Sequence, residues 1–157
     1  MQQADRTLRH LTGYQLRRAT SAAMPEVNKV LEEFGLRRST YSSLVVVVAN
    51  PGLNQGQLAD ALAIERPNLV QIVDQLERAK LVRRTKSVED RRAYALQPTP
   101  KGCELEERAT RALERLDNLL REGLSEQDKE ILHRILQIIE RNAETIQERD
   151  VAEISTP

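Results

Sequence analysis

Side chains that can read DNA bases recur along residues 66–80 of this 157-residue chain. Amide side chains can pair with two atoms of an adenine edge, and arginine can pair with guanine or phosphate. The candidate DNA contacts here are Arg66, Asn68, Gln71, Gln75 and Arg78. Four apolar residues of the same segment have helical spacing, namely Leu69, Ile72, Val73 and Leu76. This spacing predicts an amphipathic helix with one buried side and one polar side. Taken alone, the pattern also fits an ordinary surface helix.

A second basic feature lies between two predicted strands, at residues 81–84 and 93–96. The intervening letters TKSVEDRR are too many for a two-residue hairpin turn and favour a longer loop, or wing. A wing can reach the narrow minor groove, which attracts arginine. The candidate wing contacts are Lys86, Asp90, Arg91 and Arg92, with Asp90 placed to hold the guanidinium of Arg92. A solvated loop is the alternative, but it leaves the density of arginines unexplained.

Two shorter helices are predicted ahead of these elements, over residues 38–50 and 55–63. The first contains four consecutive valines, which by themselves favour a strand. Ser39 as a helix N-cap, and the length of the segment, favour a helix instead. Asn54 with Gln57 three residues later is typical of a capping box that opens the second helix. The order of elements is that of a winged helix-turn-helix.

Longer helices are predicted on both sides of the winged segment. Residues 5–34 hold a helical pattern that Pro25 is expected to bend or interrupt. Thr99 followed by Pro100 predicts the start of another helix. Residues 100–148 carry apolar stripes wider than one winged module needs. We therefore expect these flanking helices to pack against a second copy of the chain.

The predicted organisation is a single, mainly α domain over residues 1–157. It contains a winged helix-turn-helix DNA-binding lobe at 38–100 and dimerisation helices at 5–35 and 100–148. An aromatic content of 3% and a charged content of 31% favour helices over a β-sandwich. The net charge is zero but segregated, with eight Lys/Arg against four Asp/Glu in residues 66–92 and eight against fourteen in residues 104–153. A basic segment on an acidic scaffold suits a phosphate-facing surface.

Little in the sequence suggests catalysis or a cofactor. We find neither a Gly-rich phosphate loop nor a Cys/His metal cluster, and the two histidines, His10 and His133, are far apart. We therefore expect no enzyme, metal site or cofactor. The lack of a long apolar run and of a signal-peptide pattern predicts a soluble, cytoplasmic protein with no membrane partner. Cys103 is the only cysteine. We expect a small buried hydrophobe there, and the alternative is a redox-responsive thiol.

The residues at the exit of the wing resemble the motif D-x-R-x-x-x-L-x-[L]-T-x-x-G of the MarR family of bacterial transcriptional regulators. The matching positions are Asp90, Arg92, Leu96, Thr99 and Gly102. The letters IERPNLVQIVDQLERAKLV resemble the recognition helix of the SlyA-like branch, and the likeness covers almost the whole chain. Pro98 stands where the family usually has an apolar residue, and we expect it to shorten the second wing strand.

The resemblance implies a homodimer that binds a palindromic operator as a repressor. Its recognition helices would enter successive major grooves about 34 Å apart, with the wings in the flanking minor grooves. It implies base contacts from Asn68, Gln71 and Gln75, and phosphate contacts from Arg66 and Arg78. The alternative is a protein-interaction dimer that has lost DNA binding, because fold alone does not fix function.

The resemblance also implies a small-molecule effector, bound between the dimer helices and the DNA-binding lobe. Two arginines beside tyrosines suit an anionic aromatic compound, and the letters YQLRRA resemble regulators that respond to hydroxycinnamoyl-CoA thioesters. The candidate effector-binding residues are Tyr14, Arg17, Arg18, Tyr41 and Leu44. Solvated arginines would explain the same letters.

Overall fold

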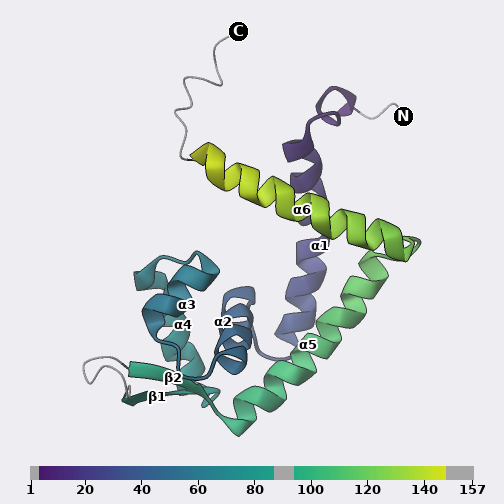
Figure 1. The fold of residues 1–157 in the computed structure, drawn as a ribbon. Helices are drawn as coiled ribbons and strands as arrows, with labels where there is room; N and C mark the ends of the chain where they lie inside the picture. The colour runs from purple at the N-terminus through teal and green to yellow at the C-terminus, as the bar shows by residue number, and fades with distance from the viewer. Residues whose placement is uncertain (1–3, 87–93, 148–157) are drawn as a thin grey trace. The chain divides into compact units, whose positions relative to one another are not determined.

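The computed structural model describes residues 4–86 and 94–147 of the chain (Figure 1). The chain divides into two compact units, Met1–Asp117 and Asn118–Pro157. The first unit contains η1 (Arg6–Leu8), α1 (Thr12–Glu32), α2 (Arg38–Ala49), α3 (Gln55–Leu62), α4 (Arg66–Arg78), β1 (Val82–Lys86), β2 (Tyr94–Pro98) and most of α5 (Pro100–Leu120). The second unit contains the end of α5 and α6 (Glu126–Gln147). The predicted class, mainly helical with a two-stranded antiparallel sheet, is confirmed.

The helix predicted over residues 5–34 is divided in the structure. A short 3-10 turn, η1, precedes α1, which begins only at Thr12. Pro25 lies inside α1, and the helix continues through it to Glu32, so the expected interruption does not occur, while the alternative of a bend stays a prediction. Pro25 is exposed. Its missing backbone donor removes one hydrogen bond, while the turns before and after it keep theirs.

The segment with four valines forms the helix α2, as predicted. Its N-cap is Arg37, so the prediction of Ser39 is wrong. The hydroxyl of Thr40 accepts a hydrogen bond from the Arg37 N–H at 2.9 Å and donates one to the Arg37 carbonyl at 2.9 Å. Val47 has no exposed surface. Burial in the core therefore outweighs the strand propensity of these valines.

Helices α3 and α4 form the helix-turn-helix. The Asn54–Gln57 capping box is confirmed: Gln57 N–H donates to Asn54 Oδ1 at 2.9 Å, and Asn54 N–H donates to Gln57 Oε1 at 2.8 Å. Ala63 has a φ of 50°, a left-handed conformation that ends α3. Pro67 follows in the first turn of α4, where its missing N–H leaves no hydrogen bond unmade.

The wing strands β1 and β2 pair antiparallel, from Val82 opposite Pro98 to Lys86 opposite Tyr94. The paired strand therefore reaches Pro98, and the expectation that this proline shortens it is wrong. Of the predicted strand residues, Ala93 lies outside the described residues.

The loop before α3 is hydrogen-bonded to the wing. Leu96 N–H donates to the Leu53 carbonyl at 2.8 Å, and Gly52 N–H donates to the Leu96 carbonyl at 2.8 Å. Leu96 is fully buried. A single core thus joins the helix-turn-helix to the sheet, and its buried members include Leu31, Leu44, Val47, Leu58, Leu69, Val73, Leu76, Val82, Leu96 and Ala109.

The start of α5 is fixed to the turn between α4 and β1. The Thr99 hydroxyl accepts a hydrogen bond from Gly102 N–H at 3.0 Å, which confirms Thr99 as the cap, and donates one to the Lys80 carbonyl at 2.7 Å. A Cβ atom at Gly102 would lie 2.1 Å from the carbonyl oxygen of Leu81. Only glycine permits this approach of α5 to the chain entering β1.

Candidate nucleic-acid interface

The polar side chains predicted on α4 are all exposed, and its apolar stripe is buried. Leu69, Ile72, Val73 and Leu76 form the buried side. The exposed residues are Arg66, Asn68, Gln71, Gln75 and Arg78. Because the helix is held by its apolar side, its hydrogen-bonding groups remain accessible to a partner. This placement is what a helix that reads base edges needs.

Arg84 of β1 links the wing to α4, and sequence reasoning missed it. Its guanidinium lies 2.5 Å from the Asp74 carboxylate and also pairs with the carboxylate of Glu77. The backbone N–H of Arg84 donates to the same Glu77 at 3.2 Å. With its amide oxygen turned towards the guanidinium, Gln55 of α3 also accepts a hydrogen bond from Arg84, at 2.9 Å. Arg84 therefore joins β1 to both α4 and α3.

The charge of Arg84 is stabilised by its surroundings. Partial burial opposes the charge, but hydrogen bonding to Asp74 and the nearby carboxylate of Glu77 outweigh it and raise the pKa of Arg84 above its usual value. The arginine side chain is 23% exposed, against 46% for Asp74 and 39% for Glu77. Because the network includes three charged groups and backbone, it orients the strand more firmly than one surface pair would.

A hollow of about 400 Å³ lies beside this network. It is lined by Asn54, Gln55, Gly56, Arg66, Arg84 and Tyr94. The first turn of α3 contributes backbone N–H groups that lack partners within the helix. Tyr94 is 58% exposed at the start of β2. The hollow thus borders both the recognition helix and the wing.

The wing residues predicted to contact DNA are only partly described. Lys86 is exposed at the end of β1, opposite Tyr94. Asp90, Arg91 and Arg92 lie outside the described residues, so their contacts stay predictions.

The five candidate effector-binding residues fall into two groups. Tyr14, Arg17 and Arg18 lie near the start of α1, where Arg17 is 4.9 Å from the centre of the Tyr14 ring. Asp5 holds this group: it accepts hydrogen bonds from Tyr14 at 2.8 Å and from Arg18 at 2.9 Å. Asp5 therefore already binds two of these three side chains, and the third, Arg17, lies against the ring of Tyr14.

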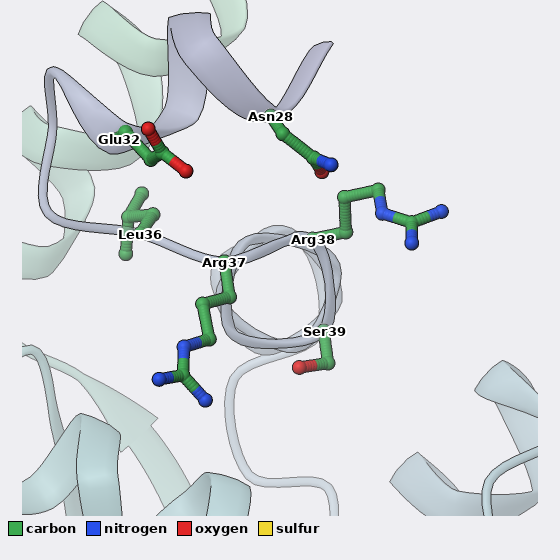
Figure 2. A pocket seen from close by; sticks show the side chains of 6 residues that line it. All are labelled: Asn28, Glu32, Leu36, Arg37, Arg38 and Ser39. Carbon is green, nitrogen blue, oxygen red and sulfur yellow. The ribbon is translucent and has the colours of Figure 1, made fainter. Parts of the chain in front are cut away.

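The other two candidates belong to α2. The Tyr41 hydroxyl is 2.9 Å from that of Thr110 in α5. Leu44 has no exposed surface and packs in the core, so it faces no cleft in this conformation. A hollow of about 500 Å³ at the junction of α1 and α2 contains none of the five candidates. Figure 2 shows its lining of Asn28, Glu32, Leu36, Arg37, Arg38 and Ser39.

Three other residues singled out by the sequence are exposed. Cys103 is a free, exposed cysteine in the first turns of α5, so the expectation of a buried hydrophobe is wrong. Its neighbour Gly102 is buried instead and lies against Leu81. His10 and His133 are both exposed.

In the described part of the chain, no helix is long and apolar enough to span a membrane.

The helix-turn-helix, the paired wing strands and the exposed polar side of α4 define a winged-helix protein of the DNA-binding type. Residues 34–93 match the sequence model of the MarR family. A protein of Thauera aromatica, described as a transcriptional regulator of the hcr operon, is 34% identical over 130 residues, covering 82% of this chain and 78% of its own length. The regulator YybA of Bacillus subtilis is 26% identical, covering 76% of this chain and 82% of its own length. The chain belongs to the MarR family and is a transcriptional regulator, not an enzyme.

Solved structures agree with this assignment. The transcriptional repressor CouR, bound to a 23-mer DNA duplex, has a TM-score of 0.82 and 33% identity, covering 88% of this chain and 99% of that one. A MarR-family regulator from Rhodococcus sp. RHA1 has a TM-score of 0.74 and 28% identity, with coverages of 88% and 96%. SlyA, at 22% identity, a TM-score of 0.76 and coverages of 86% and 95%, shares the fold.

Proposed function

We propose that this regulator is a repressor that binds a palindromic operator as a homodimer and is released by a small effector. The observation that carries the proposal is the two-sided character of α4. Its apolar side is sealed into the core, while a row of amides and guanidiniums is exposed. CouR, which shares 33% identity and was solved on a DNA duplex, supports the same use of the fold.

Roles on α4 follow from the chemistry of the side chains. Asn68, Gln71 and Gln75 would read base edges, because an amide can donate and accept at once. Arg66 and Arg78, at the two ends of the helix, would contact phosphates. Phosphate contacts position the protein without carrying sequence information.

The wing is proposed to reach the minor groove. Lys86 is exposed where β1 enters the loop, and the sequence places Asp90, Arg91 and Arg92 in the residues that follow. In this proposal Arg91 and Arg92 enter the narrow groove, and Asp90 orients one of them. The Arg84 network supports the proposal because it holds β1 against the recognition helix.

A homodimer would cover apolar side chains that are exposed in the single chain. Exposed large apolar residues on α6 and near the end of α5 are Leu119, Leu120, Leu124, Leu132, Ile135, Leu136, Ile138 and Ile146, and those before α1 are Leu8 and Leu11. Soluble monomers rarely expose this many large apolar side chains. A second copy that carries the same surface pairs with it by symmetry.

The proposed effector is an anionic aromatic compound or its CoA thioester. Tyr14 with Arg17 stacked against its ring offers an aromatic surface and a cation. Such a ligand would release DNA only if it bound the DNA-free conformation more tightly than the DNA-bound one. Arg18 already pairs with Asp5, so a ligand that used Arg18 would compete with this ion pair.

The proposal is tested by selecting bound fragments of the source genome with the purified protein at two salt concentrations. We expect one palindromic site to be enriched, with affinity that falls as salt rises. The double variant Gln71→Ala/Gln75→Ala should lose the enrichment but keep its thermal midpoint, since both side chains are exposed. Gln127→Ala, an exposed glutamine on α6, is the matched control. A folded wild-type dimer that enriches nothing would refute DNA binding and favour the interaction dimer.

A further inference from the structure

We propose that Val70 reads thymine, by contact with its C5-methyl group in the major groove. This inference rests on the proposed function, in which α4 enters that groove. Val70 is 43% exposed, whereas its neighbours in the apolar stripe, Leu69 and Val73, are 1% and 0% exposed. Among the described residues, it is the one large apolar side chain of α4 that is exposed.

Neither helix stability nor core packing explains a valine at this position. A β-branched residue is a weaker helix former than alanine or a long polar residue. Its exposure means that much of its apolar surface gains nothing from folding. A partner that covers the side chain would recover that gain. On a helix that reads DNA, the apolar partner available in the major groove is the methyl of thymine.

The surroundings of Val70 match the two features of a thymine edge. A hollow of about 220 Å³ is lined by Gln55, Gly56, Arg66, Leu69 and Val70. Leu69 and Val70 give it an apolar wall, and the side-chain amide of Gln55 gives it a hydrogen-bond donor. Thymine presents a methyl group next to the O4 acceptor in the major groove. The same hollow can thus contact the methyl and donate to its neighbour.

Gly56 keeps this hollow open. A Cβ atom at Gly56 would lie 3.1 Å from Asn54 Oδ1 and 4.0 Å from a terminal nitrogen of Arg66. A side chain there would therefore project into the space between α3 and α4 that the hollow occupies. The Asn54 carbonyl group concerned is the one that caps α3, so it is not free to move aside.

The test is a double-mutant cycle between protein and operator. Each symmetric pair of thymines in the selected duplex is replaced by deoxyuridine, which lacks only the methyl, and dissociation constants are measured by fluorescence anisotropy. For wild type we expect one pair of positions to weaken binding by about fourfold per half-site, the value of one buried methyl group. Val70→Ala should bind the thymine duplex more weakly and show no further loss with deoxyuridine at that pair.

Controls separate this contact from neighbouring effects. Gln71→Ala should weaken binding but keep the deoxyuridine penalty, because it leaves Val70 in place. A cytosine at the critical position should bind poorly, and 5-methylcytosine should restore part of the affinity because it returns the methyl group. Val70→Ala should not lower the thermal midpoint, since alanine is the better helix former.

Two outcomes would overturn the inference, and they are distinguishable. If wild type binds its operator specifically but Val70→Ala keeps every deoxyuridine penalty, the thymine contact is wrong and the proposed function stands. If wild type fails to distinguish the operator from a scrambled duplex, the proposed function and the inference both fail.

Discussion

The guanidinium of Arg84 in β1 lies 2.5 Å from the carboxylate of Asp74, on the exposed side of the recognition helix α4. The same arginine pairs with Glu77, one turn further along α4. The ion pairs cross from β1 to α4, so they set the direction of β1 relative to that helix. The ion pairs therefore hold β1 and α4 in a fixed arrangement, which the proposed DNA contacts need.

We predict that Arg84→Met weakens operator binding by about tenfold, which corresponds to a loss of roughly 1.4 kcal/mol of binding free energy when β1 is no longer oriented. Methionine keeps the apolar stem but removes the charge, so the fold should remain and the thermal midpoint should fall only slightly. Asp74→Asn should weaken binding less, since Glu77 still holds the arginine. In the double variant the losses should not add, as expected for partners in one network. Strictly additive losses would contradict the orienting role.

We predict that Gly102→Ala destabilises the fold by about 1–3 kcal/mol or more, as overpacking does. The new Cβ would lie 2.1 Å from the Leu81 carbonyl oxygen. That oxygen belongs to backbone and cannot swing aside, so α5 would have to shift. Chemical denaturation measures the effect, with Glu104→Ala on the exposed side of α5 as control. Equal stability of Gly102→Ala and wild type would show that the contact is not tight in solution.

We predict that Asp5 titrates far below an ordinary aspartate. Hydrogen bonds from Arg9 and then Tyr14 lower the pKa of Asp5 from 3.8 to about 2. Because the folded-state pKa lies below the unfolded value, this contribution to stability is fully present above pH 3.8 and is lost as the pH falls through about 2. NMR titration of the Asp5 carboxyl carbon checks the value, and Arg9→Gln should move the midpoint upward. A wild-type midpoint near 3.8 would show that the hydrogen bonds from Arg9 and Tyr14 to Asp5 do not persist in solution.

We predict that Ile135→Glu shifts the protein from dimer to monomer. Ile135 is 45% exposed in the single chain, so glutamate disturbs no core but would bury a charge in the proposed interface. Light scattering after size exclusion gives the mass directly. Glu130→Ala, at an exposed position of the same helix, should stay dimeric. A wild type that is monomeric at micromolar concentration would contradict the dimer.

The local signals in the sequence were sufficient for most elements of the fold. Asn54 with Gln57, and Thr99 before Pro100, predicted helix starts because capping depends on residues within one turn. The valines of α2 were assigned to a helix because capping and length were weighed with propensity. Ser39 was misjudged because the helix begins one residue before it, and the hydroxyl that serves this terminus is that of Thr40, which reaches back to the N–H of the cap residue Arg37.

Parts of the site depend on contacts that spacing does not show. Arg84 reaches Asp74 across the turn between α4 and β1, ten residues away in sequence. In β1 Arg83 is exposed and Arg84 is half-buried, but two consecutive arginines in the sequence do not show which one faces α4. Leu44 and Cys103 were misplaced for a similar reason. The side of a helix that meets the core is determined by the elements packed against it. In α5 the buried residue is Gly102, so its neighbour Cys103 lies on the exposed side.

The most direct test of the central claim is a measurement of affinity for two duplexes of equal length and composition. One carries the selected palindrome, and the other has the same bases scrambled in both half-sites. The account predicts at least about a thousandfold preference for the palindrome, the lower range for specific regulators, and weaker binding to both as salt rises. Equal affinity of a folded dimer for the two duplexes would contradict it, because α4 would then contact DNA without reading it.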